Sequence, residues 1–287
     1  MLFGEHAVLR GKLAICAAIN KRIHITLTPR SDESITLFSR LGEHTTTTHK
    51  LEMHPQFRFV MQTLASYPKL PSGCDITIDS EFSHLFGFGS SASVTVAMLG
   101  VLNLWTKAND TKEQTFQKAL DVVRAVQGQA SGADVAASTF GSCIAYRMGP
   151  LSIERLGWRL LLTAVYSGSK MGTREVIAYV NKKAEQEPLL YAQLFDLMDS
   201  VSEQAKRHPN NLGPLFCFAQ GLMEALGVSN KTLSDIVYTL RAQPGITGAK
   251  ISGSGLGDSC IGLGSVEFQS NYPVITLTTS DEGLLYA

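Results

Sequence analysis

The stretch LFGFGSSASVTVAML, residues 85–99, places two glycines and two serines directly before a long apolar run. Gly87 and Gly89 allow the backbone to approach a ligand closely, because glycine carries no side chain. A helix that begins near Ser90 leaves its first backbone N–H groups without partners inside the helix, and such groups attract anions. The stretch therefore predicts a phosphate-binding loop at the start of a helix.

Length and composition set the bounds for the rest of the chain. A chain of 287 residues with 44% hydrophobic content is long enough for two domains of ordinary size. Lysine plus arginine balances aspartate plus glutamate at 25 each, so we expect neither nucleic acid nor an anionic membrane as a partner. Five scattered cysteines without a C-x-x-C pair indicate reduced thiols in a cytoplasmic protein rather than a zinc site or a disulfide scaffold.

The N-terminal sequence and the apolar runs argue against membrane and export segments. No apolar run approaches the roughly 20 residues that cross a bilayer. Glu5, His6 and Arg10 interrupt the N-terminus where a signal peptide needs an apolar core, so we expect no signal peptide.

Hydrophobic periodicity predicts strands and helices in both halves of the chain. In the first half we expect strands within 12–28, 34–38 and 74–80, and helices at 57–67, 92–105 and 116–127, the last ending at Gly128. In the second half we expect strands at 141–148, 158–168, 248–252, 260–264 and 273–279, and helices at 173–185, from Pro188, at 212–226 and at 233–240. The polar tract 149–157 is the expected domain boundary.

Two further motifs accompany the glycine loop, and each has an ordinary alternative. LFGEHAVLRGK, residues 2–12, embeds the charged pair Glu5 and His6 in a strand-like pattern, although such a pair is also common on surfaces. GAKISGSGLGDSC, residues 248–260, places glycines between two strand-like segments. That segment fits a hairpin loop, or a nest of backbone N–H groups that binds an anion.

The glycine loop alone also fits the dinucleotide fingerprint G-x-G-x-x-[GA] or a purely structural turn. The fingerprint requires the first turn of its domain and an acidic residue at the end of the next strand, whereas this loop lies well inside the domain and a polar segment, KANDTKEQ, follows the helix. Serine hydroxyls beside a phosphate can reach magnesium. A nucleoside triphosphate therefore fits better than a nicotinamide cofactor.

In this order and spacing, LFGEH, SHLFGFGSSA and KISGSGLGD together resemble the three motifs of the GHMP kinase superfamily, over residues 2–264. The superfamily includes galactokinases, homoserine kinases, mevalonate kinases and phosphomevalonate kinases. The resemblance implies an α+β fold of two domains. These are a ribosomal-protein-S5-like α/β domain at 1–155, which binds ATP and carries the catalytic residues, and a ferredoxin-like α+β domain at 156–287.

The resemblance also implies roles for individual residues. GQASGADVAASTFGS, residues 128–142, looks like the family segment S-G-x-D, whose aspartate is the catalytic base, here Asp134. The two glycine motifs would bind ATP through Gly87, Phe88, Gly89, Ser90, Ser91, Ala92, Gly253, Ser254 and Gly255. Ser91 would contact Mg²⁺. Glu5, His6 and Thr173 would contact the substrate, although Thr173 equally fits the cap of a helix.

Within the superfamily two segments point to different members. GEHAVLRGKLAICAAIN resembles mevalonate kinases, whereas QGQASGADVAASTFGS is closer to phosphomevalonate kinases. We weight the first segment more, which implies transfer of the γ-phosphate of ATP to the hydroxyl of mevalonate, a step of isoprenoid precursor synthesis. Phosphomevalonate remains the alternative acceptor.

Two positions depart from the family pattern. The lysine of the first motif would fall before Met1, and we expect it upstream; Lys12 is not an obvious substitute. Mevalonate kinases carry a magnesium-binding glutamate eleven residues before the catalytic aspartate, where this chain has Val123. Valine cannot bind a metal, so Mg²⁺ would depend on Ser91, the triphosphate and water.

These departures keep other classes of function open. A catalytically weakened kinase fold that binds a metabolite predicts ATP binding without product. A dehydrogenase predicts binding of a nicotinamide cofactor, and a purely structural or interaction protein leaves three glycine-rich segments without a purpose. The apolar residues of the second-half helices are expected to cover a sheet, with a homodimer contact as the alternative.

Overall fold

The computed structural model describes residues 1–83 and 86–286. His84 and Leu85, which belong to the glycine motif, lie outside the described residues. The chain forms two compact units, and neither is a continuous stretch. Unit 1 holds residues 1–20, 86–88 and 141–281, and unit 2 holds residues 21–83, 89–140 and 282–286. The predicted boundary at residue 155 divides the chain into the two domains that the family resemblance implies. The compact units do not test that boundary, so it stays a prediction.

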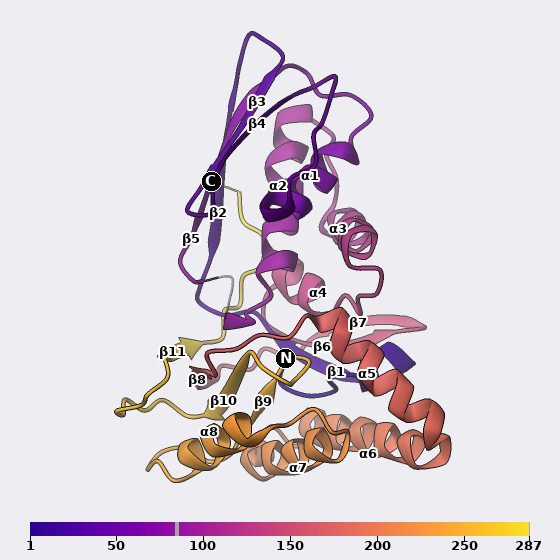
Figure 1. Cartoon of the computed structure of the whole chain (residues 1–287), viewed down its shortest axis with the longest axis vertical. Coiled ribbons are helices and arrows are strands. Elements are labelled where there is room, and N and C mark those ends of the chain that lie inside the picture. The colour runs from indigo at the N-terminus through magenta and orange to yellow at the C-terminus, as the bar shows by residue number, and fades with distance from the viewer. Residues whose placement is uncertain (84–85, 287) are drawn as a thin grey trace. The chain divides into compact units, whose positions relative to one another are not determined.

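Unit 2 packs helices against one face of a four-stranded sheet (Figure 1). The strand order is β2-β5-β3-β4, and every neighbouring pair is antiparallel except β3 with β5. The strands are β2 (Ile23–Pro29), β3 (Ser34–Ser39), β4 (Gly42–Thr47) and β5 (Cys74–Ser80). The helices are η2 (Pro55–Phe57), α1 (Arg58–Ala65), α2 (Ser90–Thr106), α3 (Lys112–Gln127) and α4 (Ala133–Phe140).

The core of unit 2 lies between α1, α2 and the sheet. Its buried side chains include Leu37, Met61, Leu64, Ile76 and Met98. The helix α3 begins with a capping box between Thr111 and Gln114, which the sequence analysis did not single out, and its C-cap is Gly128, where its end was predicted. The last residues of the chain also belong here, because the Leu284 side chain lies against Gly100 of α2.

Unit 1 contains two antiparallel sheets and the helices α5 to α8. The sheets have the orders β1-β6-β7 and β11-β8-β10-β9. The strands are β1 (Ala14–Ala17), β6 (Cys143–Met148), β7 (Leu151–Arg155), β8 (Leu161–Tyr166), β9 (Ala249–Ser252), β10 (Ser259–Leu263) and β11 (Val274–Thr278). The helices are η1 (Ala7–Arg10), α5 (Thr173–Gln186), α6 (Pro188–Arg207), η4 (Pro209–Asn211), α7 (Leu212–Ala225) and α8 (Lys231–Arg241).

Helices α7 and α8 pack on the strands β9 and β10, and α6 packs on α7 (Figure 1). Their buried apolar side chains join those of β8, β9 and β10 in one core, which includes Phe216, Leu233, Leu240 and Ile251. The expected helices from Pro188, at 212–226 and at 233–240 are confirmed, and α7 and α8 cover the sheet that contains β9 and β10.

Besides the helix α4, which the sequence analysis did not expect, four details differ from the sequence expectations. The strand-like segment 2–12 instead contains the short helix η1, because Gly4, His6 and Gly11 have left-handed backbone angles (φ 83°, 60° and 76°) that end an extended strand. The polar tract 149–157 contains strand β7, which pairs with β6. Strand β4, with the sequence GEHTTT, was not expected either. Both missed strands lie at sheet edges, where one face does not need apolar side chains.

The fourth difference concerns the start of α5. The N-cap residue is Gly172, not Thr173, and it has no side chain to cap this helix. Thr173 is the first helical residue and is exposed. The helix-cap role considered for Thr173 is therefore wrong.

Two global properties can be stated for the described part of the chain. No helix in it is both long and apolar enough to span a membrane. All five cysteines lie in it, and they are free thiols, four of them buried.

Candidate active site

The predicted site residues divide between the two units. The first glycine loop passes from unit 1 to unit 2 between Phe88 and Gly89. Gly87 and Gly89 both adopt the left-handed conformation (φ 69° and 73°), which explains why the loop carries glycine at these two positions. The loop then enters α2 at Ser90, as the sequence predicts.

The start of α2 is suited to an anion. Its N-cap residue is Gly89, which has no side chain to cap the helix. The first backbone N–H groups of a helix have no partner within it, so those of Ser90, Ser91 and Ala92 can serve a ligand. Ser90 and Ser91 are partly exposed, whereas Ala92 is buried.

Asp134 lies in the first turn of α4, next to the glycine loop within unit 2. A methyl group placed on Gly89 would lie 3.6 Å from Cβ of Asp134. The two helices are also joined by a hydrogen bond of 3.2 Å between the hydroxyls of Ser93 and Ser138. The structure therefore brings the predicted base and the end of the predicted phosphate loop together.

Burial sets the proton affinity of Asp134. It raises the pKa of this carboxyl above its ordinary value. The backbone N–H of Val135, which donates to Oδ1 at 3.0 Å, opposes the shift because it stabilises the charged form. A carboxylate with a raised pKa is a stronger base than an ordinary one, which suits proton abstraction near neutral pH.

The second glycine loop, residues 253–258, joins β9 to β10 as a hairpin in unit 1. Gly253 and Gly255 have positive φ angles (97° and 85°). The loop is packed against Val228, whose carbonyl accepts a hydrogen bond of 2.7 Å from Leu256 N–H. The expected glycine-rich loop between two strands is confirmed.

Asp258, at the end of this loop, is a residue that the sequence analysis did not single out. It is 5% exposed and adopts a left-handed conformation (φ 62°). Its backbone exchanges hydrogen bonds with Ser167 and Ser169, and its Oδ1 lies 3.5 Å from Lys170 Nζ. Burial raises the pKa of the Asp258 carboxyl, and the Lys170 ammonium opposes that shift.

Asp258 also contacts the first glycine loop, since a methyl group on Gly87 would lie 3.0 Å from its Cβ and Cγ. Within unit 1, three loops thus meet at this carboxylate: 86–88, 167–171 and 253–258. An acidic residue directly after a run of glycines was the available sequence signal.

The first motif is buried in unit 1. Glu5 and His6 are 3% and 6% exposed. The Glu5 carboxylate is paired with Lys250 of β9, which is fully buried. His6 Nε2–H donates a 2.8 Å hydrogen bond to the Ser254 carbonyl. Burial lowers the pKa of His6, so its ring is neutral at neutral pH. That these two residues contact substrate stays a prediction.

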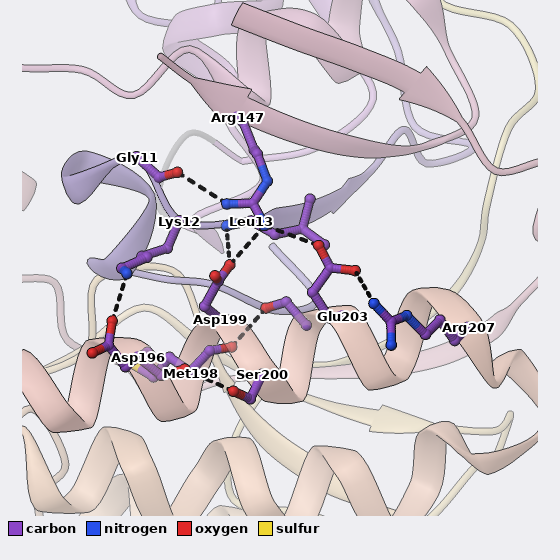
Figure 2. Close-up of polar contacts among 11 residues, drawn as sticks. Gly11, Lys12, Leu13, Arg147, Asp196, Met198, Asp199, Ser200, Glu203 and Arg207 are labelled. Carbon is purple, nitrogen blue, oxygen red and sulfur yellow. Dashed lines mark hydrogen bonds and ion pairs between the residues drawn. The ribbon is translucent and has the colours of Figure 1, made fainter. Parts of the chain in front are cut away.

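Lys12 is engaged elsewhere (Figure 2). Its Nζ lies 2.5 Å from Oδ1 of Asp196 on α6, and the next backbone N–H, of Leu13, donates to Asp199 at 2.7 Å. Arg147 joins the same group through the Gly11 carbonyl. Lys12 therefore helps to hold residues 11–13 on α6, in agreement with the expectation that it does not replace the family lysine.

Val123, at the position of the family's magnesium-binding glutamate, is part of the apolar interior. It lies in α3, is 1% exposed and packs in the interior of unit 2. In the described part of the chain, no group of three or more histidine, cysteine, aspartate or glutamate side chains could hold a metal ion.

Comparison with known proteins identifies the family. The model described as GHMP kinases N terminal domain matches residues 57–142, and the model described as GHMP kinases C terminal matches residues 200–269. A mevalonate kinase of Archaeoglobus fulgidus is 33% identical over 267 residues, which cover 92% of this chain and 89% of that relative. The chain belongs to the GHMP kinase family.

Further similar proteins agree with this family assignment. A mevalonate kinase of Methanothermobacter thermautotrophicus is 32% identical over 270 residues, 91% of this chain and 86% of the relative. The crystal structure of L. major mevalonate kinase in complex with R-mevalonate has the same fold, with a TM-score of 0.79 and 24% identity over 99% of this chain and 94% of that one. The GHMP kinase described here is an ATP-dependent kinase that acts on an alcohol, and its fold is the predicted α+β fold.

Proposed function

We propose that this GHMP kinase transfers the γ-phosphate of ATP to the hydroxyl of mevalonate. The observation that carries the chemistry is the position of Asp134 beside the glycine loop, where a methyl group on Gly89 would lie 3.6 Å from its Cβ. The acceptor is supported by the two curated relatives, which are mevalonate kinases at 33% and 32% identity over more than nine tenths of the chain. They favour mevalonate, the acceptor that the first motif indicates, over phosphomevalonate, the acceptor that residues 127–142 indicate.

In the proposed reaction the triphosphate binds along residues 87–92, where the N-terminus of α2 offsets part of its negative charge. Asp134 accepts the proton of the acceptor hydroxyl while that oxygen forms a bond to the γ-phosphorus. The bond between the γ-phosphorus and the oxygen that bridges to the β-phosphorus breaks, and ADP leaves with the electron pair. The protein contributes mainly geometry and charge compensation, as expected for phosphoryl transfer. Gly253, Ser254 and Gly255 would contribute to the ATP site, and Thr173 to the substrate.

Magnesium is the ion that this chemistry implies. The residues present fit a Mg²⁺ ion whose ligands are mostly phosphate oxygens and water molecules. Ser91 supplies a partly exposed hydroxyl at the start of α2, and Val123 supplies no ligand. Mg²⁺ commonly retains several waters and binds substrate phosphates. When bound, it neutralises charge on the β- and γ-phosphates.

A direct assay tests the acceptor. ADP formation is measured with ATP and Mg²⁺, with mevalonate and phosphomevalonate offered separately to wild type and to Asp134→Asn. Turnover with mevalonate that Asp134→Asn abolishes is the expected result. Turnover with phosphomevalonate alone would transfer the assignment to that acceptor. ATP binding without either product would identify a metabolite-binding member of the family.

We further propose a cytoplasmic location, which the five free thiols support. A homodimer stays a prediction, to be checked by sedimentation.

A further inference from the structure

The carboxylate of Asp258 lies beside both glycine loops that the proposed function assigns to ATP. A methyl group on Gly87 would lie 3.0 Å from its Cγ and 3.1 Å from its Oδ1, and a methyl group on Gly253 would lie 3.9 Å from its Oδ2. The Asp258 side chain is only 7% exposed. A buried negative charge is therefore built into unit 1 next to a loop that is expected to bind a polyanion.

Stability does not explain an aspartate at this position. Its backbone is left-handed (φ 62°), a conformation that glycine adopts without strain. Its Oδ1 is buried and accepts no hydrogen bond from the described residues. Burial without such a bond costs free energy, and a carboxylate beside a triphosphate would also repel it. The charge of Asp258 therefore needs a partner that is compatible with phosphate binding.

That partner is Lys170, in the connection between β8 and α5. The Lys170 Nζ atom lies 3.5 Å from Asp258 Oδ1, and the Lys170 side chain is 36% exposed. The backbone around Lys170 is fixed to the second glycine loop. The Asp258 N–H donates to the Ser169 carbonyl at 2.8 Å, and a methyl group on Gly257 would lie 3.0 Å from Cα of Lys170. The pair therefore combines a buried carboxylate with a lysine side chain that solvent reaches.

The difference in exposure gives the two charges different tasks. An ammonium has three N–H donors, so it can bind a carboxylate and a phosphate oxygen at the same time. Oδ1 of Asp258, the oxygen that faces Lys170, is buried, so this carboxylate serves the ammonium rather than a ligand. Burial raises the pKa of the Asp258 carboxyl and Lys170 opposes that shift, as expected if the ion pair keeps the carboxylate charged.

We propose that Asp258 is a positioning residue, which holds the ammonium of Lys170 near Gly87 so that Lys170 binds a phosphate oxygen of ATP. This inference rests on the proposed function, in which the loop at Gly87 binds the triphosphate. It adds one side-chain cation to the charge compensation that phosphoryl transfer requires.

The first test measures nucleotide binding without an acceptor. In calorimetry with Mg²⁺ and the non-hydrolysable analogue adenylyl imidodiphosphate, Lys170→Met should weaken the Kd about 10–100-fold, the loss expected for a hydrogen bond to a charged group. Lys170→Arg keeps the cation and should stay within about threefold of wild type. Lys231→Met is the matched control and should leave the Kd unchanged, because Lys231 pairs with Asp235 at the surface of the same unit, with side chains 87% and 59% exposed.

A double-mutant cycle tests the role of Asp258. Asp258→Asn keeps the shape of the side chain and removes its charge, so the ammonium loses its anchor and the Kd should weaken about tenfold. The double variant Asp258→Asn/Lys170→Met should bind the analogue within about threefold of Lys170→Met, because no ammonium is left to position. In steady-state kinetics both single variants should raise the KM for ATP and leave the KM for mevalonate within about twofold of wild type.

Other results would overturn the inference. An unchanged Kd in Lys170→Met would exclude Lys170 from the nucleotide site, and a higher KM for mevalonate alone would place it against the acceptor. Equal losses in Lys170→Met and Lys170→Arg would mean that the positive charge is not what matters. Tighter binding in Asp258→Asn, with the same gain in the Lys170→Met background, would mean that Asp258 acts only by repelling the phosphates.

The binding measurement also separates this inference from the proposed function. If wild type binds the analogue but phosphorylates neither mevalonate nor phosphomevalonate, the proposed function fails while the Kd comparison still decides the role of Lys170. If wild type does not bind the analogue, the inference fails as well. Because the Lys170 side chain is partly exposed, Lys170→Met is expected to fold, and it decides the inference even if Asp258→Asn does not fold.

Discussion

Replacing one partner of the buried Glu5–Lys250 pair should be far more damaging than replacing both. In Lys250→Met the carboxylate of Glu5 would remain in a site that is 2% exposed, with no opposite charge. In the double variant Glu5→Met/Lys250→Met the space is refilled by side chains of similar length, and no charge stays buried. The comparison therefore isolates the electrostatic role of the pair.

The magnitudes follow from complete burial. Breaking a buried ion pair at one end costs about 3–5 kcal/mol, whereas replacing both ends by apolar residues is neutral or stabilising by about 1–4 kcal/mol. For 287 residues the unfolding entropy is about 0.6 kcal/mol/K, at roughly 2.1 cal/mol/K per residue. Lys250→Met should then lower the Tm by about 5–8 °C, and the double variant should match or exceed wild type.

Scanning calorimetry and urea unfolding of wild type, Glu5→Met, Lys250→Met and the double variant give the coupling free energy of the pair. Lys206→Met is the matched control, because Lys206 pairs with Glu154 at the surface, at 2.5 Å, with side chains 31% and 53% exposed. Its loss should cost less than about 1 kcal/mol. The reasoning is refuted if Lys250→Met costs no more than this control, or if the double variant is as unstable as Lys250→Met.

Four further predictions concern the site. Asp134→Asn should lower kcat by about 10²–10⁴-fold. The same variant should also raise the Tm at neutral pH. Burial raises the pKa of Asp134 in the folded state, so the wild-type protein loses stability as the pH rises through that pKa, whereas asparagine stays uncharged. An unchanged Tm would contradict this. Burial lowers the pKa of His6, so the free energy of unfolding should fall below pH 6.5 by up to about 1.4 kcal/mol per pH unit, and urea titrations of His6→Gln should show a shallower slope. Gly87→Ala and Gly245→Ala both place alanine at a positive φ, so each should lower the free energy of unfolding in urea by about 1–2 kcal/mol. Only Gly87→Ala should also raise the KM for ATP, because its methyl group meets Asp258. Ser91→Ala should shift the Mg²⁺ titration of activity to higher concentration, and an unmoved midpoint would remove Ser91 from the metal site.

The sequence predicted the helix boundaries that depend on residues at the boundary itself. Apolar residues after the glycine loop indicated a helix from about Ser90, and Gly128 marked the end of α3; both are confirmed. Pro188 likewise begins α6. In each case a residue with a special backbone preference lies at the element boundary itself, so no distant contact was needed.

Features that depend on distant contacts could not be predicted. The short helix η1 replaces a strand because His6 is held in a left-handed conformation, and its ring is bonded to a residue 248 positions away. Strand β7 is stabilised by pairing with β6 rather than by its own composition. Asp258 gains its surroundings only where three loops meet. Of the candidate site, the structure places Asp134 beside the glycine loop at Gly89, whereas the roles of Asp134, Glu5, His6 and Thr173 stay predictions.

The order in which the ribosome delivers the chain gives the Glu5–Lys250 pair a further consequence. At roughly 5–20 residues per second, the 245 residues between them take about 12–50 s to emerge, and unit 2 residues 21–83 and 89–140 emerge within that interval. During this time Glu5 must stay in water, because no partner exists to accompany it into the interior. The N-terminal segment can join unit 1 only after β9 has been made. Nascent chains halted before Lys250 should therefore leave the first motif accessible to proteases.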